Sequence, residues 1–159
     1  MTKTLVAYFS ATGITREVAK NLAQVANADI YETKPANPYS DADLNWMNRE
    51  SRSSVEMRDK NSRPGIIEDN AHIENYDLIY LGFPIWWYIA PTIINTFLEK
   101  YDFSNKKIIL FATSGGSGFG GAVANLKTSV SPSTEIIEGD ILNNKPSVTD
   151  LKHWIEKFK

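Results

Sequence analysis

The chain alternates short apolar runs with segments whose apolar residues recur at helical spacing. A short, bounded apolar run is typical of a buried strand, and a repeat of every three or four residues is typical of an amphipathic helix. The pattern predicts strands at residues 4–9, 29–33, 78–83, 107–112 and 135–141. It predicts helices between and after them, at residues 14–27, 91–101, 119–130 and 148–158.

The central runs, residues 78–83 and 108–112, are apolar on both strand faces. Strands of this kind belong to parallel sheets that helices cover on both sides. We therefore expect an α/β fold with a doubly wound five-stranded parallel sheet in the order 2-1-3-4-5 and helices on both faces. At 159 residues, the whole chain, 1–159, is expected to be a single domain.

Two helix starts are marked by particular residues. Pro91 is placed to open the helix at 91–101, because proline is well tolerated at the beginning of a helix. Ser147 and Asp150 form an S-x-x-D start for the last helix. The apolar stripe of that helix is expected to pack on the sheet, and it consists of Leu151, Trp154, Ile155 and Phe158.

Residues 35–64 interrupt the alternation. They are polar, they lack a sustained helical stripe, and they hold four arginines, Arg49, Arg52, Arg58 and Arg63. We expect a long connection with at most a short helix near residues 41–52. Long connections in compact domains are usually functional lids or mobile segments.

The first strand runs into a hydroxyl-rich loop that opens a helix. Free backbone N–H groups and the helix dipole favour an anion at such a place. The hydroxyls of Ser10, Thr12 and Thr15 can donate to phosphate oxygens, and Gly13 allows close approach of the backbone. The loop has neither the Gly-Lys pair of nucleotide-triphosphate P-loops nor G-x-G-x-x-G. It predicts a site for a terminal monophosphate, and the competing interpretation is a helix start capped by serine or threonine.

Three consecutive aromatic residues follow the central strand at 78–83. They stand between Pro84 and Pro91, at the sheet edge where ligands lie in open α/β folds. Aromatic side chains can stack on a flat heterocycle. The competing interpretation is that Trp86 and Trp87 only fill a junction between helix and sheet.

A glycine-rich loop, residues 113–121, follows the strand at 107–112. With few side chains in the way, its backbone N–H groups can approach the edge of a ring. Alone it could be a flexible linker, but its place between a buried strand and a helix favours a binding loop.

These three loops resemble those of the flavodoxin-like family, in particular its short bacterial branch with a P-I-W-W loop. That family binds the phosphate of FMN with [S/T]-x-T-G-x-T, which residues 10–15 match. The resemblance implies a flavodoxin-like fold and FMN as cofactor, with the isoalloxazine between residues 84–88 and 113–118. The implied cofactor-binding residues are Ser10, Ala11, Thr12, Gly13, Ile14, Thr15, Pro84, Ile85, Trp86, Trp87, Tyr88, Thr113, Ser114, Gly115, Gly116, Ser117 and Gly118.

Composition narrows the function further. A net charge of −2 gives no support to nucleic-acid binding, and the absence of cysteine excludes disulfides and thiolate chemistry. The N-terminus lacks a signal-peptide layout and no apolar run approaches the ~18 residues of a membrane span, so we expect a cytoplasmic protein without a membrane partner. His72 and His153 have no metal-ligand spacing, and no metal is expected.

No residue is identifiable as a general acid or base, so no catalytic residue is assigned and the redox chemistry would belong to the cofactor. The favoured function is electron transfer to a redox partner protein or a small-molecule acceptor. The first alternative is an FMN-dependent NAD(P)H reductase of quinones or similar acceptors. The second alternative is an interaction module that keeps the fold without flavin.

Overall fold

In a computed structural model, which describes residues 3–67, 69–114, 118–143 and 146–158, the chain forms one parallel sheet. The strand order is β2-β1-β3-β4-β5, as the sequence predicted. Leu81 on β3 lies between Ala7 on β1 and Leu110 on β4. The strands are β1 (Thr4–Tyr8), β2 (Asp29–Glu32), β3 (Leu78–Pro84), β4 (Lys107–Thr113) and β5 (Glu135–Ile141).

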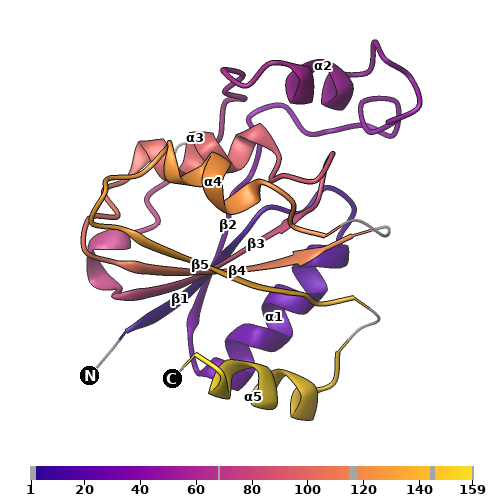
Figure 1. The fold of residues 1–159 in the computed structure, drawn as a ribbon. Helices are drawn as coiled ribbons and strands as arrows, with labels where there is room; N and C mark the ends of the chain where they lie inside the picture. Colours follow the sequence, from indigo (N-terminus) through magenta and orange to yellow (C-terminus); the bar gives the residue numbers. More distant parts are fainter. Residues whose placement is uncertain (1–2, 68, 115–117, 144–145, 159) are drawn as a thin grey trace.

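Helices cover both faces of the sheet. In Figure 1, α3 and α4 lie on one side and α1 and α5 on the other. Alternation along β1 explains the two layers, because Leu5 belongs to the core cluster under α3 and α4, whereas Val6 belongs to the cluster under α1 and α5. The helices are α1 (Ile14–Ala26), α2 (Arg52–Arg58), α3 (Thr92–Lys100), α4 (Ala122–Lys127) and α5 (Val148–Glu156), with a 3₁₀ turn η1 (Ile73–Asn75).

The last helix begins with the predicted capping box. The N–H of Asp150 donates to the Ser147 hydroxyl at 3.0 Å, and the N–H of Ser147 donates to the Asp150 carboxylate at 3.0 Å. Its stripe is buried, as predicted, at Leu151, Trp154 and Ile155. By contrast α4 begins later than the expected 119–130, because Gly120 has a left-handed backbone with φ of 50° and the helix begins only after Gly121, and it ends at Lys127.

The short helix in the long connection is not where the sequence placed it. Residues 41–50 form turns, and α2 begins at Arg52, where the range expected for the helix ends. Asparagine side chains explain the difference, because those of Asn45 and Asn48 accept the N–H groups of Met47 and Glu50 and so compete with helical hydrogen bonds. Figure 1 shows α2 standing outside the two helix layers.

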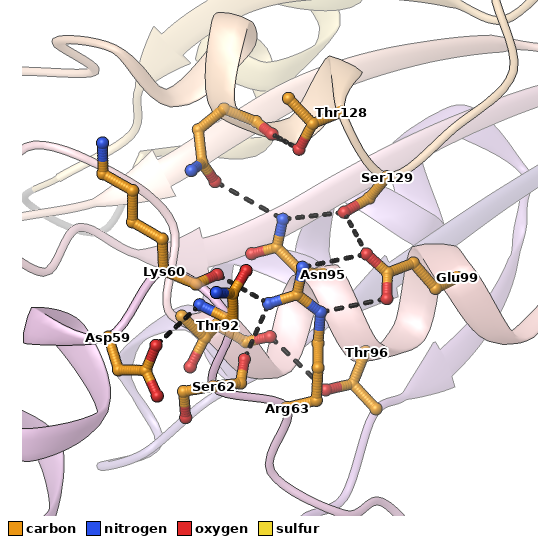
Figure 2. A network of polar contacts seen from close by, with 12 residues as sticks. Asp59, Lys60, Ser62, Arg63, Thr92, Asn95, Thr96, Glu99, Thr128 and Ser129 are labelled. Atoms are coloured by element: carbon orange, nitrogen blue, oxygen red, sulfur yellow. Dashed lines mark hydrogen bonds and ion pairs between the residues drawn. The ribbon is translucent and has the colours of Figure 1, made fainter.

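Polar contacts tie this excursion to the rest of the domain. At its end, Arg63 donates two hydrogen bonds of 3.0 Å to the Glu99 carboxylate on α3 (Figure 2). Glu99 also accepts from the Ser129 hydroxyl at 2.7 Å, and Ser129 accepts from the side-chain amide of Asn95 at 2.9 Å. Within the excursion, Arg52 lies over the Tyr39 ring, 3.9 Å from its centroid.

In the part of the chain that the structure describes, none of the helices has the length and apolar character required to cross a membrane.

Candidate functional site

The carboxyl ends of β1, β3 and β4 meet at one edge of the sheet, and the loops that follow them enclose a cavity of about 470 Å³. All three loops singled out in the sequence contribute to its wall. The lining residues are Ala11, Thr12, Ile14, Thr15, Pro84, Ile85, Trp86, Thr113 and Ser114, joined by Leu44 and Asn143. We call it the loop cavity.

The first turn of α1 opens at the loop cavity without a side-chain cap. Its N-cap residue is Gly13, with φ of 96°, and no side-chain hydrogen bond from a described residue caps the helix. The Ser10 hydroxyl oxygen accepts the N–H of Gly13 at 3.0 Å, which closes the turn and leaves the Ser10 proton available for donation. The helix is therefore not capped by serine or threonine, and its N–H groups can meet an anion.

A buried pair of hydroxyls joins two of the loops. The Thr15 and Thr113 hydroxyl oxygens lie 2.8 Å apart, and both residues are buried. Next to this pair, the N–H of Ser114 donates to the side-chain carbonyl of Asn143 at 2.9 Å, and the Asn143 amide donates to the Ser114 carbonyl at 2.7 Å. These contacts fix the end of β4 against α1 and against the segment after β5.

The aromatic segment forms a tight turn. Backbone hydrogen bonds of 3.0 and 3.2 Å pair Trp86 with Ile89, and both residues between them have left-handed backbones, with φ of 50° at Trp87 and 66° at Tyr88. This is the signature of a type I′ turn, which normally uses asparagine or glycine. Non-glycine residues held this way store about 1–3 kcal/mol each, and such strain collects at functional sites.

Gly120 lies directly against this turn. A Cβ on Gly120 would lie 2.6 Å from the Tyr88 carbonyl oxygen, so only glycine lets the two loops approach this closely.

Trp87 and Tyr88 line a second cavity of about 450 Å³, which we call the ring-side cavity because aromatic rings line it. It shares four wall residues with the loop cavity: Leu44, Ile85, Trp86 and Ser114. Trp86 packs edge-on against Phe9 and Tyr39, with ring centroids 5.9 and 5.5 Å apart, so it both fills the junction and faces the cavities. Trp87 and Tyr88 are 46% and 61% exposed, and they do not fill a core.

The excursion supplies wall residues that sequence reasoning missed. Leu44 lines both cavities, and Trp46 and Ser53 line the ring-side cavity. The Ser53 hydroxyl is buried and has no hydrogen-bond partner among the described residues. No local pattern marks these positions, because tertiary contacts alone bring the polar excursion over the aromatic turn.

Other predicted residues lie off the two cavities. Ser10 lines an adjoining cavity with Arg16 and Glu32, Gly13 shapes the loop, and Gly118 is exposed with open space around it. The predicted residues Gly115, Gly116 and Ser117 lie outside the described part of the chain.

Arg16, the cation directly after the first loop, is paired. Arg16 donates to the Glu32 carboxylate at 2.7 Å, and the Tyr8 hydroxyl donates to the same carboxylate at 3.1 Å. The hydrogen bond between Arg16 and Glu32 raises the pKa of Arg16 above its usual range, and burial raises the pKa of Tyr8. With Arg16 held by Glu32, the donors at the loop are mainly hydroxyls and backbone N–H groups.

Across residues 3–67, 69–114, 118–143 and 146–158, no group of histidines and carboxylates could hold a metal ion.

Comparison with known proteins places this architecture. A family model described as "Flavodoxin" matches residues 3–158. The chain belongs to the flavodoxin family. Two crystal structures of candidate flavoproteins resemble this flavodoxin over nearly its whole length. The protein from Bacteroides eggerthii is 43% identical, with a TM-score of 0.91 and 99% and 98% of the two chains covered. The protein from Bacteroides uniformis is 48% identical, with a TM-score of 0.91 and 98% of each chain covered.

More distant relatives are also similar to this flavodoxin. A Lactobacillus acidophilus flavoprotein in complex with FMN shares the fold, with a TM-score of 0.71, 23% identity and 98% and 99% of the two chains covered. NAD(P)H dehydrogenase [quinone] 1 of Rattus norvegicus is 30% identical in an alignment of 82 residues that covers 42% of this chain. The match spans only 30% of the rat protein's length.

Proposed function

We propose that this flavodoxin binds one FMN across the loop and ring-side cavities and acts in electron transfer. The observation that carries the proposal is the uncapped N-terminus of α1 opening into a cavity walled by the loops after β1, β3 and β4. An anion-binding helix end beside an aromatic wall suits a ligand that is a phosphate at one end and a flat heterocycle at the other. Bound FMN would supply the redox chemistry.

Different residues of this chain would bind the phosphate and the ring of FMN. Thr12, Thr15 and the first-turn N–H groups of α1 would hold the phosphate, with Ser10 as a further hydroxyl donor. Trp86, Trp87 and Tyr88 would contact the isoalloxazine. The structure of a distant relative with FMN, from Lactobacillus acidophilus, supports the same choice of cofactor.

A visible absorption spectrum of the purified protein, followed by titration of the flavin-free protein with FMN, tests this proposal. We expect the absorption bands of oxidised flavin and saturation at one FMN per chain. No flavin in the purified protein and no binding on titration would leave an interaction module that keeps only the fold.

A second candidate is an NAD(P)H-dependent reductase of quinones or similar acceptors. Two observations favour it: the partial similarity to the rat NAD(P)H dehydrogenase and the space in the ring-side cavity next to the exposed Trp87. Steady NADPH consumption by the FMN-loaded protein, with a quinone as acceptor and no partner protein, would favour the reductase. Consumption only after addition of a separate reductase would favour the electron carrier.

A further inference from the structure

A third, smaller cavity of about 250 Å³ adjoins the ring-side cavity. Trp46 and Trp87 form walls of both. The remaining wall residues of the small cavity come from the excursion: Arg49, Ser54, Met57 and Arg58. Two guanidinium groups and two indoles therefore surround one hollow, and no carboxylate is among its lining residues. We call it the arginine cavity.

The two arginines of this cavity differ from the other two of the excursion. Arg52 pairs with Glu56 at 2.9 Å, and Arg63 pairs with Glu99 at 3.0 Å. Within the described part of the chain, neither Arg49 nor Arg58 has an ion pair. Both are exposed, so both can form charge-assisted hydrogen bonds with a ligand.

We propose that the arginine cavity binds the anionic group of a small aromatic redox substrate whose ring extends toward the ring-side cavity. The inference deepens the proposed function and rests on it, because the substrate would exchange electrons with FMN in the adjoining site. A reduced nicotinamide would be oxidised by giving a hydride to oxidised FMN, and a quinone would be reduced by taking two electrons and two protons from reduced FMN. Guanidinium groups bind phosphate, sulfonate or carboxylate with paired hydrogen bonds, and indoles stack on aromatic rings. Two sources carry this chemistry: a nicotinamide nucleotide through its phosphates, or a quinone with an acidic substituent.

The Ser53 hydroxyl is evidence for a ligand that reaches into the ring-side cavity. Its hydroxyl is buried in the cavity wall without a partner in the described residues, and a buried hydroxyl in that state costs free energy. A polar atom on a bound ring would satisfy it. Because Trp46 and Trp87 line both cavities, a ligand lying along the two indoles would extend from the arginine cavity toward this hydroxyl.

Calorimetric titration of the FMN-loaded protein with three probes tests the inference. Naphthalene-2-sulfonate represents a small aromatic anion, 2-naphthol is its neutral counterpart, and adenosine 2′,5′-bisphosphate represents the nucleotide source. The variants are Arg49→Gln and Arg58→Gln. Lys60→Gln is the matched control, because it removes one exposed positive charge from the same segment outside the cavity. Thermal melting checks that each variant folds.

We expect at least one anionic probe to bind more tightly than 2-naphthol. Arg49→Gln and Arg58→Gln should each lower the affinity for that probe about tenfold, in line with the loss of one charge-assisted hydrogen bond. They should leave the affinity for 2-naphthol unchanged. Binding of the sulfonate alone would assign the site to a small aromatic anion, and binding of the bisphosphate alone would assign it to a nucleotide.

Three results would overturn the inference: no anionic probe binds, the arginine variants bind the probes as the native protein does, or Lys60→Gln weakens binding as much as they do. Each is distinct from failure of the proposed function. FMN affinity is measured first, and the arginine cavity shares no residue with the loop cavity. If FMN does not bind, the same titrations are made on the flavin-free protein.

Discussion

The hydroxyl oxygens of Thr15 and Thr113 lie 2.8 Å apart, although 98 residues separate them in the sequence. One belongs to the first turn of α1 and the other to the last residue of β4. This contact joins the proposed phosphate end of the site to the strand end beside the proposed ring. Each hydroxyl carries one proton, so one proton serves the pair and the other is free to reach a ligand.

Replacing one or both threonines separates their structural role from ligand binding. Thr113→Val leaves the buried Thr15 hydroxyl without its partner and should lower the free energy of unfolding by about 1–3 kcal/mol. The double variant Thr15→Val and Thr113→Val removes both polar groups and should regain most of that stability. It should nevertheless bind FMN more weakly, because a donor to the phosphate is lost. Urea unfolding and FMN titration measure the two effects.

A double variant that binds FMN as tightly as the native protein would show that the threonine pair is only structural.

Ser53→Ala should have opposite effects on stability and binding. Removing a buried hydroxyl that has no partner in the described residues should stabilise the ligand-free protein by about 1 kcal/mol. The same change should weaken the binding of any ligand that has a polar atom hydrogen-bonded to this hydroxyl in the ring-side cavity. Ser54→Ala is the control, because the Ser54 hydroxyl already donates to the Asn48 carbonyl at 2.8 Å and its loss should destabilise the protein.

Equal stability loss in Ser53→Ala and Ser54→Ala, measured by urea unfolding, would contradict this account of Ser53.

The aromatic turn should control the fluorescence of bound flavin. Stacking on tryptophan or tyrosine quenches flavin emission, and we expect Trp87→Ala to restore more of it than Trp86→Ala. The reason is that Trp86 already packs edge-on against Phe9 and Tyr39, whereas Trp87 is 46% exposed in a strained turn. Phe158→Ala, which removes an aromatic ring packed on Trp154 in the other helix layer, should change nothing.

If Trp86→Ala, Trp87→Ala and Tyr88→Ala all leave flavin emission and affinity unchanged, the turn is not part of the flavin site.

The link between the excursion and α3 should depend on pH. The hydrogen bond from Arg63 lowers the pKa of Glu99 below its usual value of 4.5. The resulting stability is present above pH 4.5 and is lost as pH falls through the lowered pKa. Arg63→Gln should therefore lower the free energy of unfolding at pH 7 by about 0.5–1 kcal/mol, since the pair is partly exposed. Urea unfolding at a series of pH values should show that this deficit shrinks below pH 4.5.

A deficit that is the same at every pH, or one that Lys60→Gln reproduces, would contradict a role for the Arg63–Glu99 pair.

Sequence patterns predicted the sheet and its edge because local signals agree with the tertiary arrangement there. Strands such as Leu78–Pro84 are apolar on both faces, and the alternation of strands and helices predicts that the sheet is parallel. The order 2-1-3-4-5 is one that doubly wound sheets of this kind adopt. The three loops then meet at one edge by topology alone. Thr12, Trp86 and Ser114 could be placed near one another for that reason.

The excursion could not be predicted in the same way. Its helix is short and polar, and polar side chains rather than an apolar stripe decide where it begins. Asn45 and Asn48 hold the turns before it, and the Ser51 hydroxyl caps its first turn. Leu44, Ser53 and Asn143 reach the cavities through contacts between segments far apart in the chain, such as the paired hydrogen bonds of Asn143 with Ser114. Such contacts leave no periodic signal in a single sequence.

The central claim is that the loop at residues 10–15 holds the phosphate of FMN, and the ratio of FMN to riboflavin affinity tests it most directly. Riboflavin keeps the ring and lacks the phosphate. Loss of two charge-assisted hydrogen bonds predicts that FMN binds about 100-fold more tightly, and that Thr12→Ala weakens FMN but not riboflavin. Equal affinities for the two flavins, with no effect of Thr12→Ala on FMN, would contradict the account.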